Sequence, residues 1–300
     1  MQLIKIQEIT GHQAGIYSCV SWNKTHLFTS SGDQYVALWN LNEGKQETFS
    51  IKCEGSAYHI NLINKENILV IGSSKGELYF IDLILKKEVK HYTVHKSSIF
   101  FSLENTKTNQ FYVSDGDGNL SVWNLSNLKF EMSLPFQCGK IRSMVLSEDS
   151  NWLYLACQDG NIRILDTVYF NETSRFFAHK EGCLSIITFD DFVYSSGKDG
   201  YIRIWNKTNL SLIKEIPAHN FAIYQLLLLN NKQNLISISR DKSIKLWDIN
   251  TMTVLQKIER KHGGHSHSVN SCCQPSKNEV ITVGDDKRII HWKLGFKERL

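Results

Sequence analysis

Four sets of residues combine a histidine, a hydroxyl side chain, an aspartate and a tryptophan at fixed spacing. In each set the aspartate follows the hydroxyl residue by four positions and precedes the tryptophan by six, and the histidine stands 20 to 22 positions before the aspartate. The sets are His12, Thr29, Asp33 and Trp39; His179, Ser195, Asp199 and Trp205; His219, Ser237, Asp241 and Trp247; and His265, Thr282, Asp286 and Trp292. Histidine, serine and aspartate could form a hydrolase triad. A catalytic site is needed only once, however, so four copies favour a structural role.

The chain carries none of the short motifs that mark common catalytic sites. It has no GxSxG, no GxxxxGK[ST], no HExxH and no Rossmann glycine pattern after a strand. Residues 115–118, DGDG, look superficially like a calcium loop but lack the further ligands of an EF-hand. The histidines at 262, 265 and 267 could suggest a metal cluster, but His265 already belongs to a repeated set. We therefore predict a protein that is not an enzyme and holds no metal and no cofactor.

Composition and charge exclude or disfavour several classes of protein. The 300 residues are 42% hydrophobic, which is enough for a sizeable core and excludes disorder as the main state. The formal net charge of +4 is too balanced for a typical nucleic-acid binder. No apolar run approaches the roughly 20 residues of a membrane span, and the first residues lack a secretory signal. The seven cysteines, an odd number without a CxxC pair, favour reduced thiols in a cytoplasmic protein over disulfides or a zinc site.

A repeated motif positions the four sets. Each copy, such as SGKDGYIRIWN at 196–206 or SRDKSIKLWD at 239–248, joins a turn to an alternating strand. The anchoring strand residues are spaced by 42, 42, 42, 40, 42 and 45 positions, and they are Trp39, Ile81, Trp123, Leu165, Trp205, Trp247 and Trp292. Further β-rich runs flank each copy, so each repeat has the four short antiparallel strands of one propeller blade. We therefore predict an all-β fold, a seven-bladed β-propeller of four-stranded antiparallel blades that forms a single domain over residues 1–300.

The repeats resemble those of the WD40 family along essentially the whole chain. The resemblance implies an inner strand a, then strands b and c, and an outer strand d in each blade. It also implies a buried hydrogen-bonded network within a blade, made of a histidine before strand a, a hydroxyl in strand b, an aspartate in the b–c turn and a tryptophan in strand c. The four sets fit these positions. A buried aspartate needs donors, which the histidine and the turn amides can supply, and the hydroxyl can accept a bond from the indole N–H.

Three repeats depart from this pattern. The third has a histidine, an aspartate and a tryptophan at 95, 117 and 123 but a valine, Val113, at the hydroxyl position. The fourth keeps only Asp159, beside Gln137, Leu155 and Leu165, and the second keeps none, with Cys53, Ile71, Lys75 and Ile81. We expect the second and fourth blades to depend on apolar packing and to be less rigid.

The two ends of the chain are predicted to complete one blade. The last motif ends near Trp292 and leaves the seventh repeat short of an outer strand. Residues 3–9, LIKIQEI, alternate like a strand and precede His12. We expect this N-terminal strand to pair into the last blade, which removes exposed edges.

The resemblance also implies which positions face a partner on the narrower face, around the central channel. These are the third and fifth residues after the blade histidine and the residue before the turn aspartate. Counting from these positions gives two sets, aromatic residues at Tyr17, Tyr58, Phe100 and Tyr224 and cations at Lys140, Arg142, Lys198 and Arg240. Aromatic and arginine side chains are favoured at interaction hot spots, and cations suit an acidic group on a peptide. The alternative is that the aromatic residues cap the channel and the cations are simply solvated.

We therefore predict a non-enzymatic protein-interaction module or scaffold. Its partner would be a protein or peptide with an apolar anchor and an acidic or phosphorylated flank, bound on the narrow face. A nucleic-acid-binding propeller is one alternative, and an enzyme that uses the channel mouth is another, although Asp285 is the only acid at the counted positions. We expect a monomer without a membrane partner, and nucleic acid is disfavoured as a ligand. The chain looks similar to small stand-alone bacterial WD-repeat proteins.

Overall fold

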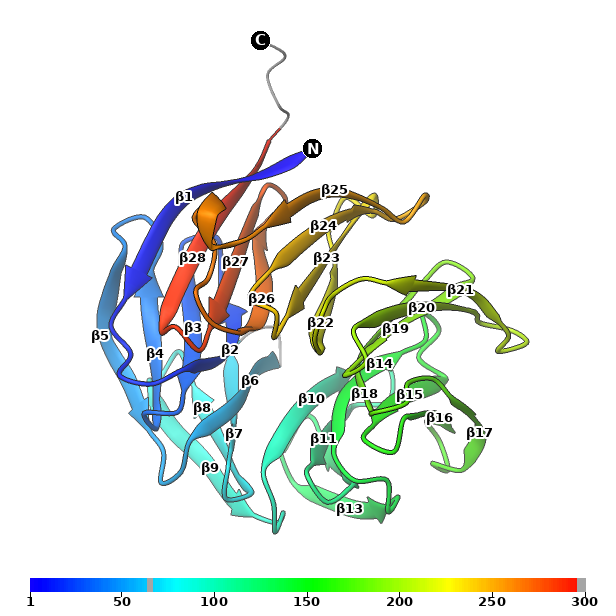
Figure 1. The fold of residues 1–300 in the computed structure, drawn as a ribbon. Coiled ribbons are helices and arrows are strands. Elements are labelled where there is room, and N and C mark those ends of the chain that lie inside the picture. The colour runs from blue at the N-terminus through cyan, green and yellow to red at the C-terminus, as the bar shows by residue number, and fades with distance from the viewer. Residues whose placement is uncertain (64–66, 296–300) are drawn as a thin grey trace. The chain divides into compact units, whose positions relative to one another are not determined.

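The computed structural model describes residues 1–63 and 67–295 of the chain. Over these residues the strands form seven four-stranded sheets, and each sheet is one blade of a β-propeller (Figure 1). The chain groups into two compact units, one of residues 1–57 with 224–300 and the other of residues 58–223. The predicted fold class of seven four-stranded antiparallel blades is confirmed. The prediction of a single domain over residues 1–300 stays a prediction.

The first unit holds blades 1, 6 and 7. Blade 1 has strands β2 (Ile16–Ser21), β3 (His26–Ser31), β4 (Tyr35–Asn40) and β5 (Lys45–Lys52). Blade 6 has β22 (Ile223–Leu228), β23 (Asn234–Ser239), β24 (Ile244–Asp248) and β25 (Thr253–Ile258), and a short 3-10 helix, η1 (Arg260–His262), follows it. Blade 7 combines β26 (Val269–Ser276), β27 (Glu279–Gly284) and β28 (Arg288–Gly295) with β1 (Gln2–Thr10).

The second unit holds blades 2 to 5. Blade 2 has β6 (Ala57–Ile63), β7 (Ile68–Ser73), β8 (Glu77–Asp82) and β9 (Lys87–Thr93). Blade 3 has β10 (Ile99–Asn105), β11 (Gln110–Asp115), β12 (Asn119–Asn124) and β13 (Phe130–Pro135). Blade 4 has β14 (Ile141–Leu146), β15 (Trp152–Cys157), β16 (Asn161–Asp166) and β17 (Glu172–Phe177). Blade 5 has β18 (Cys183–Phe189), β19 (Phe192–Gly197), β20 (Tyr201–Asn206) and β21 (Leu212–Pro217).

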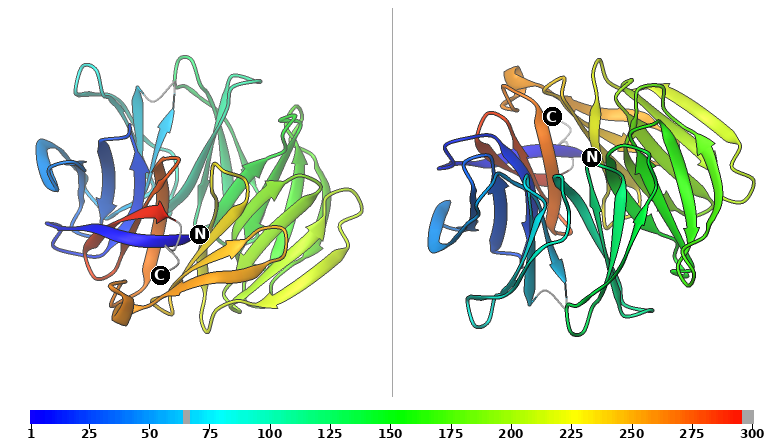
Figure 2. Two further views of the ribbon diagram at one scale, coloured as in Figure 1. Left: turned by 90° about the horizontal axis from the view of Figure 1, so that it is seen from above. Right: turned by 90° about the horizontal axis from the view of Figure 1, so that it is seen from below.

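Strand β1 completes blade 7 as the sequence predicts. It pairs antiparallel with β28, from Gln2 opposite Gly295 to Thr10 opposite Arg288, with an irregularity between Lys5 and Gln7. In Figure 2 the dark blue β1 lies along the red β28. The inward side chain of Ile9 is buried, so β1 contributes to the core as well as to the sheet.

The apolar core lies between neighbouring blades within each unit. Both central strands of a blade are buried on both faces, which explains their continuous apolar runs. Leu120 and Val122 of blade 3 pack in one cluster with Met144 and Leu155 of blade 4. Burying a side chain of this size stabilises the fold by about 1.5–3 kcal/mol.

Each blade has two ends, which carry different loops. The upper end carries the loop before strand a and the b–c turn, and the lower end carries the a–b and c–d turns. The b–c turn is tight. Gly160 in blade 4 has φ +87°, and a Cβ there would clash with the carbonyl oxygen of His179, so a larger residue cannot fit.

Candidate functional site

The histidine, hydroxyl, aspartate and tryptophan of the first predicted set meet at the upper end of blade 1. His12 Nδ1 lies 2.8 Å from Asp33 Oδ2, and His12 Nε2 lies 2.8 Å from Thr29 Oγ1. The indole Nε1 of Trp39 donates to the same Thr29 hydroxyl at 2.6 Å. These bonds join the loop before strand a to the b–c turn and to strand c.

The sets of blades 5 and 6 occupy the same places. In blade 5 His179 Nδ1 lies 3.0 Å from Asp199 Oδ1, and Ser195 accepts at 2.9 Å from Trp205 Nε1 and lies 2.9 Å from His179 Nε2. Burial opposes ionisation of Asp199, but its bonds with His179 and Arg203 outweigh burial and lower its pKa to about 2. In blade 6 Trp247 Nε1 donates to Ser237 Oγ at 2.8 Å, and the other two residues of the set, His219 and Asp241, lie in the matching loop and turn.

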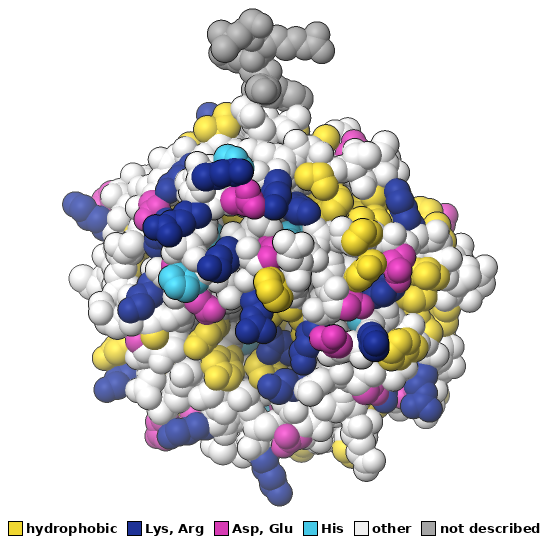
Figure 3. All heavy atoms as spheres, in the orientation of Figure 1, with side chains coloured by type: hydrophobic (Ala, Val, Ile, Leu, Met, Phe, Trp, Pro, Cys, Tyr) yellow, Lys and Arg dark blue, Asp and Glu magenta, His cyan; other side chains and the backbone are white. Residues whose placement is uncertain are grey.

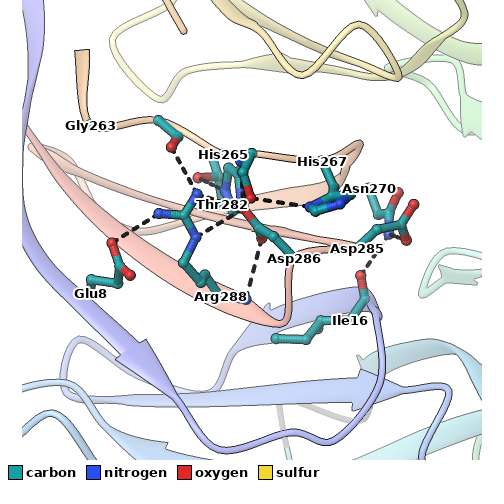
Figure 4. Close-up of polar contacts among 12 residues, drawn as sticks. Glu8, Ile16, Gly263, His265, His267, Asn270, Thr282, Asp285, Asp286 and Arg288 are labelled. Carbon is teal, nitrogen blue, oxygen red and sulfur yellow. Dashed lines mark hydrogen bonds and ion pairs between the residues drawn. The ribbon is translucent and has the colours of Figure 1, made fainter. Parts of the chain in front are cut away.

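The set of blade 7 is extended by an arginine (Figure 4). His265 lies 2.8 Å from Asp286 and 2.9 Å from Thr282, which accepts from Trp292 at 2.8 Å. Arg288 pairs with Asp286 at 2.7 Å and with a carboxylate of β1, Glu8, at 3.2 Å. Burial opposes ionisation of Asp286, but the hydrogen bond with His265 and the nearby positive charges lower its pKa.

The interpretation of blade 3 is wrong in two residues. The carboxylate that His95 Nδ1 contacts, at 2.9 Å, belongs to Asp115 at the end of β11 and not to Asp117. The hydroxyl comes from Ser121 in strand c, which lies 2.8 Å from His95 Nε2 and accepts from Trp123 at 2.7 Å. A complete network therefore exists in this blade. It could be missed because spacing along one strand does not reveal a hydroxyl on the neighbouring strand.

Blades 2 and 4 replace the network with other polar groups. In blade 2 the Ser73 hydroxyl donates to the buried carboxylate of Glu77 at 2.7 Å. In blade 4 the guanidinium of Arg163, which is only 4% exposed, pairs with Asp159 at 2.8 Å and with Glu172 at 3.3 Å. Apolar packing is thus not their only support, and their lower rigidity stays a prediction.

Four of the predicted partner-binding residues meet at the upper end of the second unit, and we call them the cation–aromatic cluster: Tyr58, Phe100, Lys140 and Arg142. The first two are the second residues of β6 and β10, and their rings stack with centroids 5.8 Å apart and planes 9° apart. Arg142, the second residue of β14, places its Cζ 4.4 Å from the centre of the Phe100 ring. Lys140 Nζ lies 5.3 Å from the same centre.

Two cations therefore share one aromatic ring. The ring face attracts positive charge, which holds both side chains in place. The two cations repel each other, however, and within the described residues no carboxylate lies within ion-pair distance of Lys140. An anionic group placed beside the ring would relieve this repulsion. The cluster can thus hold an apolar or aromatic group and a negative group side by side.

The other predicted binding residues also lie at the upper ends of their blades, one of them in the second unit and three in the first. Lys198 is exposed in the b–c turn of blade 5. Tyr17 and Tyr224 are the second residues of β2 and β22, both half-buried, and Arg240 is exposed in the turn after β23. On the face shown in Figure 3, Lys and Arg side chains lie against hydrophobic ones.

The described residues give two results on metals and membranes. No group of histidine, cysteine and acidic side chains within residues 1–63 and 67–295 is arranged to hold a metal ion. Nor does this part of the chain form a helix with the length and hydrophobicity needed to cross a membrane.

Two family models match the chain. The model described as LRRK2 beta propeller matches residues 1–262. The model described as WD domain, G-beta repeat matches residues 256–293. Together they cover the seven blades.

Similar proteins carry the matching segment within longer chains. A WD repeat-containing protein 91 homolog of Dictyostelium discoideum is 26% identical over 97% of this chain and 40% of its own length. A WD repeat-containing protein 55 homolog of the same organism is 23% identical over 79% of this chain and 59% of its own. Mouse kinesin-like protein KIF21B is 20% identical over 96% of this chain and 16% of its own. The chain thus spans less than two thirds of each of these relatives, and the predicted similarity to bacterial proteins stays a prediction.

Proposed function

Because the chain belongs to the LRRK2 beta propeller family and is built of WD40 repeats, we propose that it is a non-enzymatic module or scaffold that binds a protein or peptide. Propeller folds serve many functions, so the function is inferred from the site. The relatives named above hold their matching segment within longer chains, which supports an interaction module in a larger assembly.

The cation–aromatic cluster is the observation that supports this function best. Its stacked rings are pre-positioned on the second residues of β6 and β10, so binding would not have to order them. Half-buried aromatic and arginine side chains are the residue types that contribute most affinity at interfaces. An apolar or aromatic anchor of the partner would cover Phe100, and a carboxylate or phosphate would lie between Lys140 and Arg142.

We propose the other upper-end residues as further partner-binding residues, each within its own unit. Lys198 adds exposed positive charge in the second unit, and in the first unit Arg240 adds an exposed charge and Tyr17 and Tyr224 add half-buried rings. Charges at the rim of an interface mainly raise the association rate and add sensitivity to salt. We also propose a cytoplasmic location, because all seven cysteines are free thiols.

Affinity purification from the native host, followed by mass spectrometry, tests this function. The wild-type protein should recover a partner that a Phe100→Ala, Arg142→Ala variant loses while it keeps its fold. The Lys52→Ala variant, which changes an exposed residue of the outer strand β5, is the control and should recover the same partner. Equal recovery by all three proteins would refute the site. Recovery of nucleic acid with an affinity that falls steeply with salt would refute the partner class.

A further inference from the structure

Six c–d turns at the lower ends of blades 1 to 6 share one construction. In each, the side chain of a leading Asn or Asp accepts hydrogen bonds from the backbone N–H groups of the third and fourth residues, and the fifth residue has a positive φ of 51–66°. The turns are residues 40–44, 82–86, 124–128, 166–170, 206–210 and 248–252. The turn geometry therefore depends on the first and fifth residues and leaves the third and fourth free to vary.

Two of the six turns carry apolar residues at these free positions. Four turns have polar pairs there, which are Asn42–Glu43, Ser126–Asn127, Thr208–Asn209 and Asn250–Thr251. Blade 2 has Ile84 and Leu85, 71% and 59% exposed, and blade 4 has Val168 and Tyr169, 68% and 80% exposed. Within the described residues, Tyr169, Ile84 and Val168 are the most exposed of the large apolar side chains. Since the turn does not need them, their exposure indicates a contact surface.

Contacts on both sides fix the blade 4 turn, and a further exposed apolar side chain lies on the neighbouring strand β15. Phe170, the fifth residue of the turn, is buried edge-on against Tyr112, with ring centroids 5.9 Å apart. The Thr167 hydroxyl donates to the carbonyl oxygen of Ser150 at 2.8 Å. Trp152, opposite the leading residue of the turn in the strand register, is 39% exposed. The exposed pair therefore belongs to a fixed apolar patch and does not sit on a loose loop.

Three lysines, beside the blade 2 pair and after the turn of blade 3, have no ion-pair partner within the described residues, and one exposed carboxylate, Glu88, follows Lys87 directly. Lys86 and Lys87 directly follow the apolar pair of blade 2, and Lys129 follows the turn of blade 3, which lies between the two apolar turns in the blade order of this unit. All three are exposed, and no carboxylate of residues 1–63 or 67–295 lies within ion-pair distance of them. An acidic partner would complement them.

The same end of blade 4 also presents exposed carboxylates. Glu148 and Asp149 stand in its a–b turn, and Lys107 of blade 3 bonds the Asp149 carbonyl oxygen at 2.8 Å. An anionic lipid surface would be repelled by these two acids, whereas a folded or peptide partner can place its own charges around them. A protein segment is therefore favoured over a bilayer.

We propose that the lower ends of blades 2 to 4 form a second docking surface, which takes a segment of a partner protein with apolar side chains flanked by aspartate or glutamate. The two exposed apolar pairs anchor the segment, and Lys86, Lys87 and Lys129 contact its carboxylates. This surface is at the opposite end of the blades from the cation–aromatic cluster, so one chain can hold two partners at once. That arrangement is what a scaffold requires.

The chain itself supplies the design of the test. Replacing both pairs by the blade 5 sequence, as Ile84→Thr, Leu85→Asn, Val168→Thr and Tyr169→Asn, keeps the turn geometry and removes the apolar contacts. A Thr208→Ala, Asn209→Ala variant is the matched control. Displayed random peptides are selected on the wild-type protein, and the affinity of the enriched peptides is measured for each variant. Thermal melts check that the variants fold.

We expect enrichment of peptides with at least two apolar residues and neighbouring acids. Their affinity should fall about tenfold or more in the turn replacement and stay unchanged in the control and in the Phe100→Ala, Arg142→Ala variant. Failure to enrich such peptides, or undiminished binding by the turn replacement, overturns the proposal. So does binding to phosphatidylserine vesicles that the turn replacement abolishes, because the surface would then be a lipid site. Only the response of the Phe100→Ala, Arg142→Ala variant bears on the upper-end site, so the two proposals fail separately.

Discussion

Val113 and Ser121 are cross-strand partners in blade 3, and the hydroxyl that His95 and Trp123 contact belongs to Ser121. In blade 1 the hydroxyl stands on the other member of the matching pair, Thr29 opposite Ala37. Paired residues on neighbouring strands point to the same face with their Cβ atoms about 5 Å apart. Either member of the pair can therefore deliver the hydroxyl to the same place between the histidine and the tryptophan.

Replacing Ser121 with alanine should destabilise the protein by about 1–3 kcal/mol, because two buried polar groups lose their common partner. The double variant Val113→Thr, Ser121→Val should recover much of this loss, since it moves the hydroxyl to the position used in blade 1. Urea unfolding at neutral pH measures both changes. A Ser121→Ala protein as stable as the wild type would show that this hydroxyl contributes nothing.

The fold could be predicted from the sequence because its signal is repeated. A tryptophan or aliphatic residue every 40 to 45 positions, with alternating strands around it, fixes the blade number and the strand order. The closing strand could also be predicted, since residues 3–9 alternate between apolar and polar side chains and the last repeat is one strand short. The position of Asp115 could not, because the spacing of 20 to 22 from His95 fits both Asp115 and Asp117, and the spacing of six to Trp123 favours Asp117.

For the proposed binding residues, the sequence predicts their places in each repeat but not the contacts between their side chains. Counting from His95 in blade 3, and from Cys53 and Gln137 at the matching positions of blades 2 and 4, places Phe100, Tyr58 and Arg142 at equivalent points of neighbouring blades, and the structure has them there. That both Lys140 and Arg142 lie over the ring of Phe100 depends on side-chain direction and on the packing of one blade against the next. Neither is encoded in spacing. The exposed apolar turns could have been found by aligning the six c–d turns with one another.

Asp199→Ala and Asp241→Ala should each destabilise the fold, by about 1–3 kcal/mol, through the loss of a half-buried acceptor. Lys75→Ala should be nearly neutral, because this exposed lysine stands at the matching turn of blade 2, where the set is missing. Thermal melts of the three variants decide this. Equal losses at Lys75 and Asp199 would mean that the aspartates do not support the blades through the network.

Stability should depend on pH through His59, which is buried and lies 2.8 Å from the Ser102 hydroxyl. Burial lowers the pKa of His59 from its ordinary value of 6.5 to about 3. Below pH 6.5 the unfolded chain therefore binds a proton at this histidine and the folded chain does not. The free energy of unfolding falls by up to about 1.4 kcal/mol per pH unit down to about pH 3.

A His59→Gln variant lacks this group and should show a flatter fall in stability between pH 6.5 and 4. Urea unfolding at several pH values measures the two slopes, and equal slopes would contradict the prediction.

Asp199 affects the stability of the fold at lower pH values than His59 does. Its pKa is lowered to about 2, so the stability it contributes is present above the ordinary value of 3.8 and is lost as the pH falls towards 2.

Removal of residues 1–9 should expose the edge of β28 and promote aggregation, because β1 supplies both backbone bonds and the buried Leu3 and Ile9. Size-exclusion chromatography with light scattering follows the loss of monomer. Ile4→Ser, Ile6→Ser is the matched control, since these two side chains of β1 are 45% and 48% exposed. A truncated protein that stays monomeric with an unchanged melting temperature would show that β1 is dispensable.

At the upper end, aromatic substitutions should lower the affinity for the partner, and arginine substitutions should mainly lower the association rate. A Tyr17→Ala, Tyr58→Ala variant and a Phe100→Ala variant should keep their fold and lose about 2 kcal/mol or more of binding free energy, because truncating a desolvated aromatic anchor removes packing that nothing replaces. An Arg142→Ala, Arg240→Ala variant should associate more slowly and show a weaker dependence on salt, since it removes two positive charges that attract an acidic partner during the encounter.

These effects are measured as association and dissociation rates with the recovered partner at low and high salt. The aromatic variants should raise the dissociation rate at both salt concentrations, whereas the arginine variant should differ from the wild type mainly at low salt. Lys52→Ala, on the outer strand β5, should match the wild type in every rate. If the aromatic and arginine variants bind as the wild type does and the turn replacement of blades 2 and 4 does not, the recovered partner occupies the lower end, and the cation–aromatic cluster is only a structural cap.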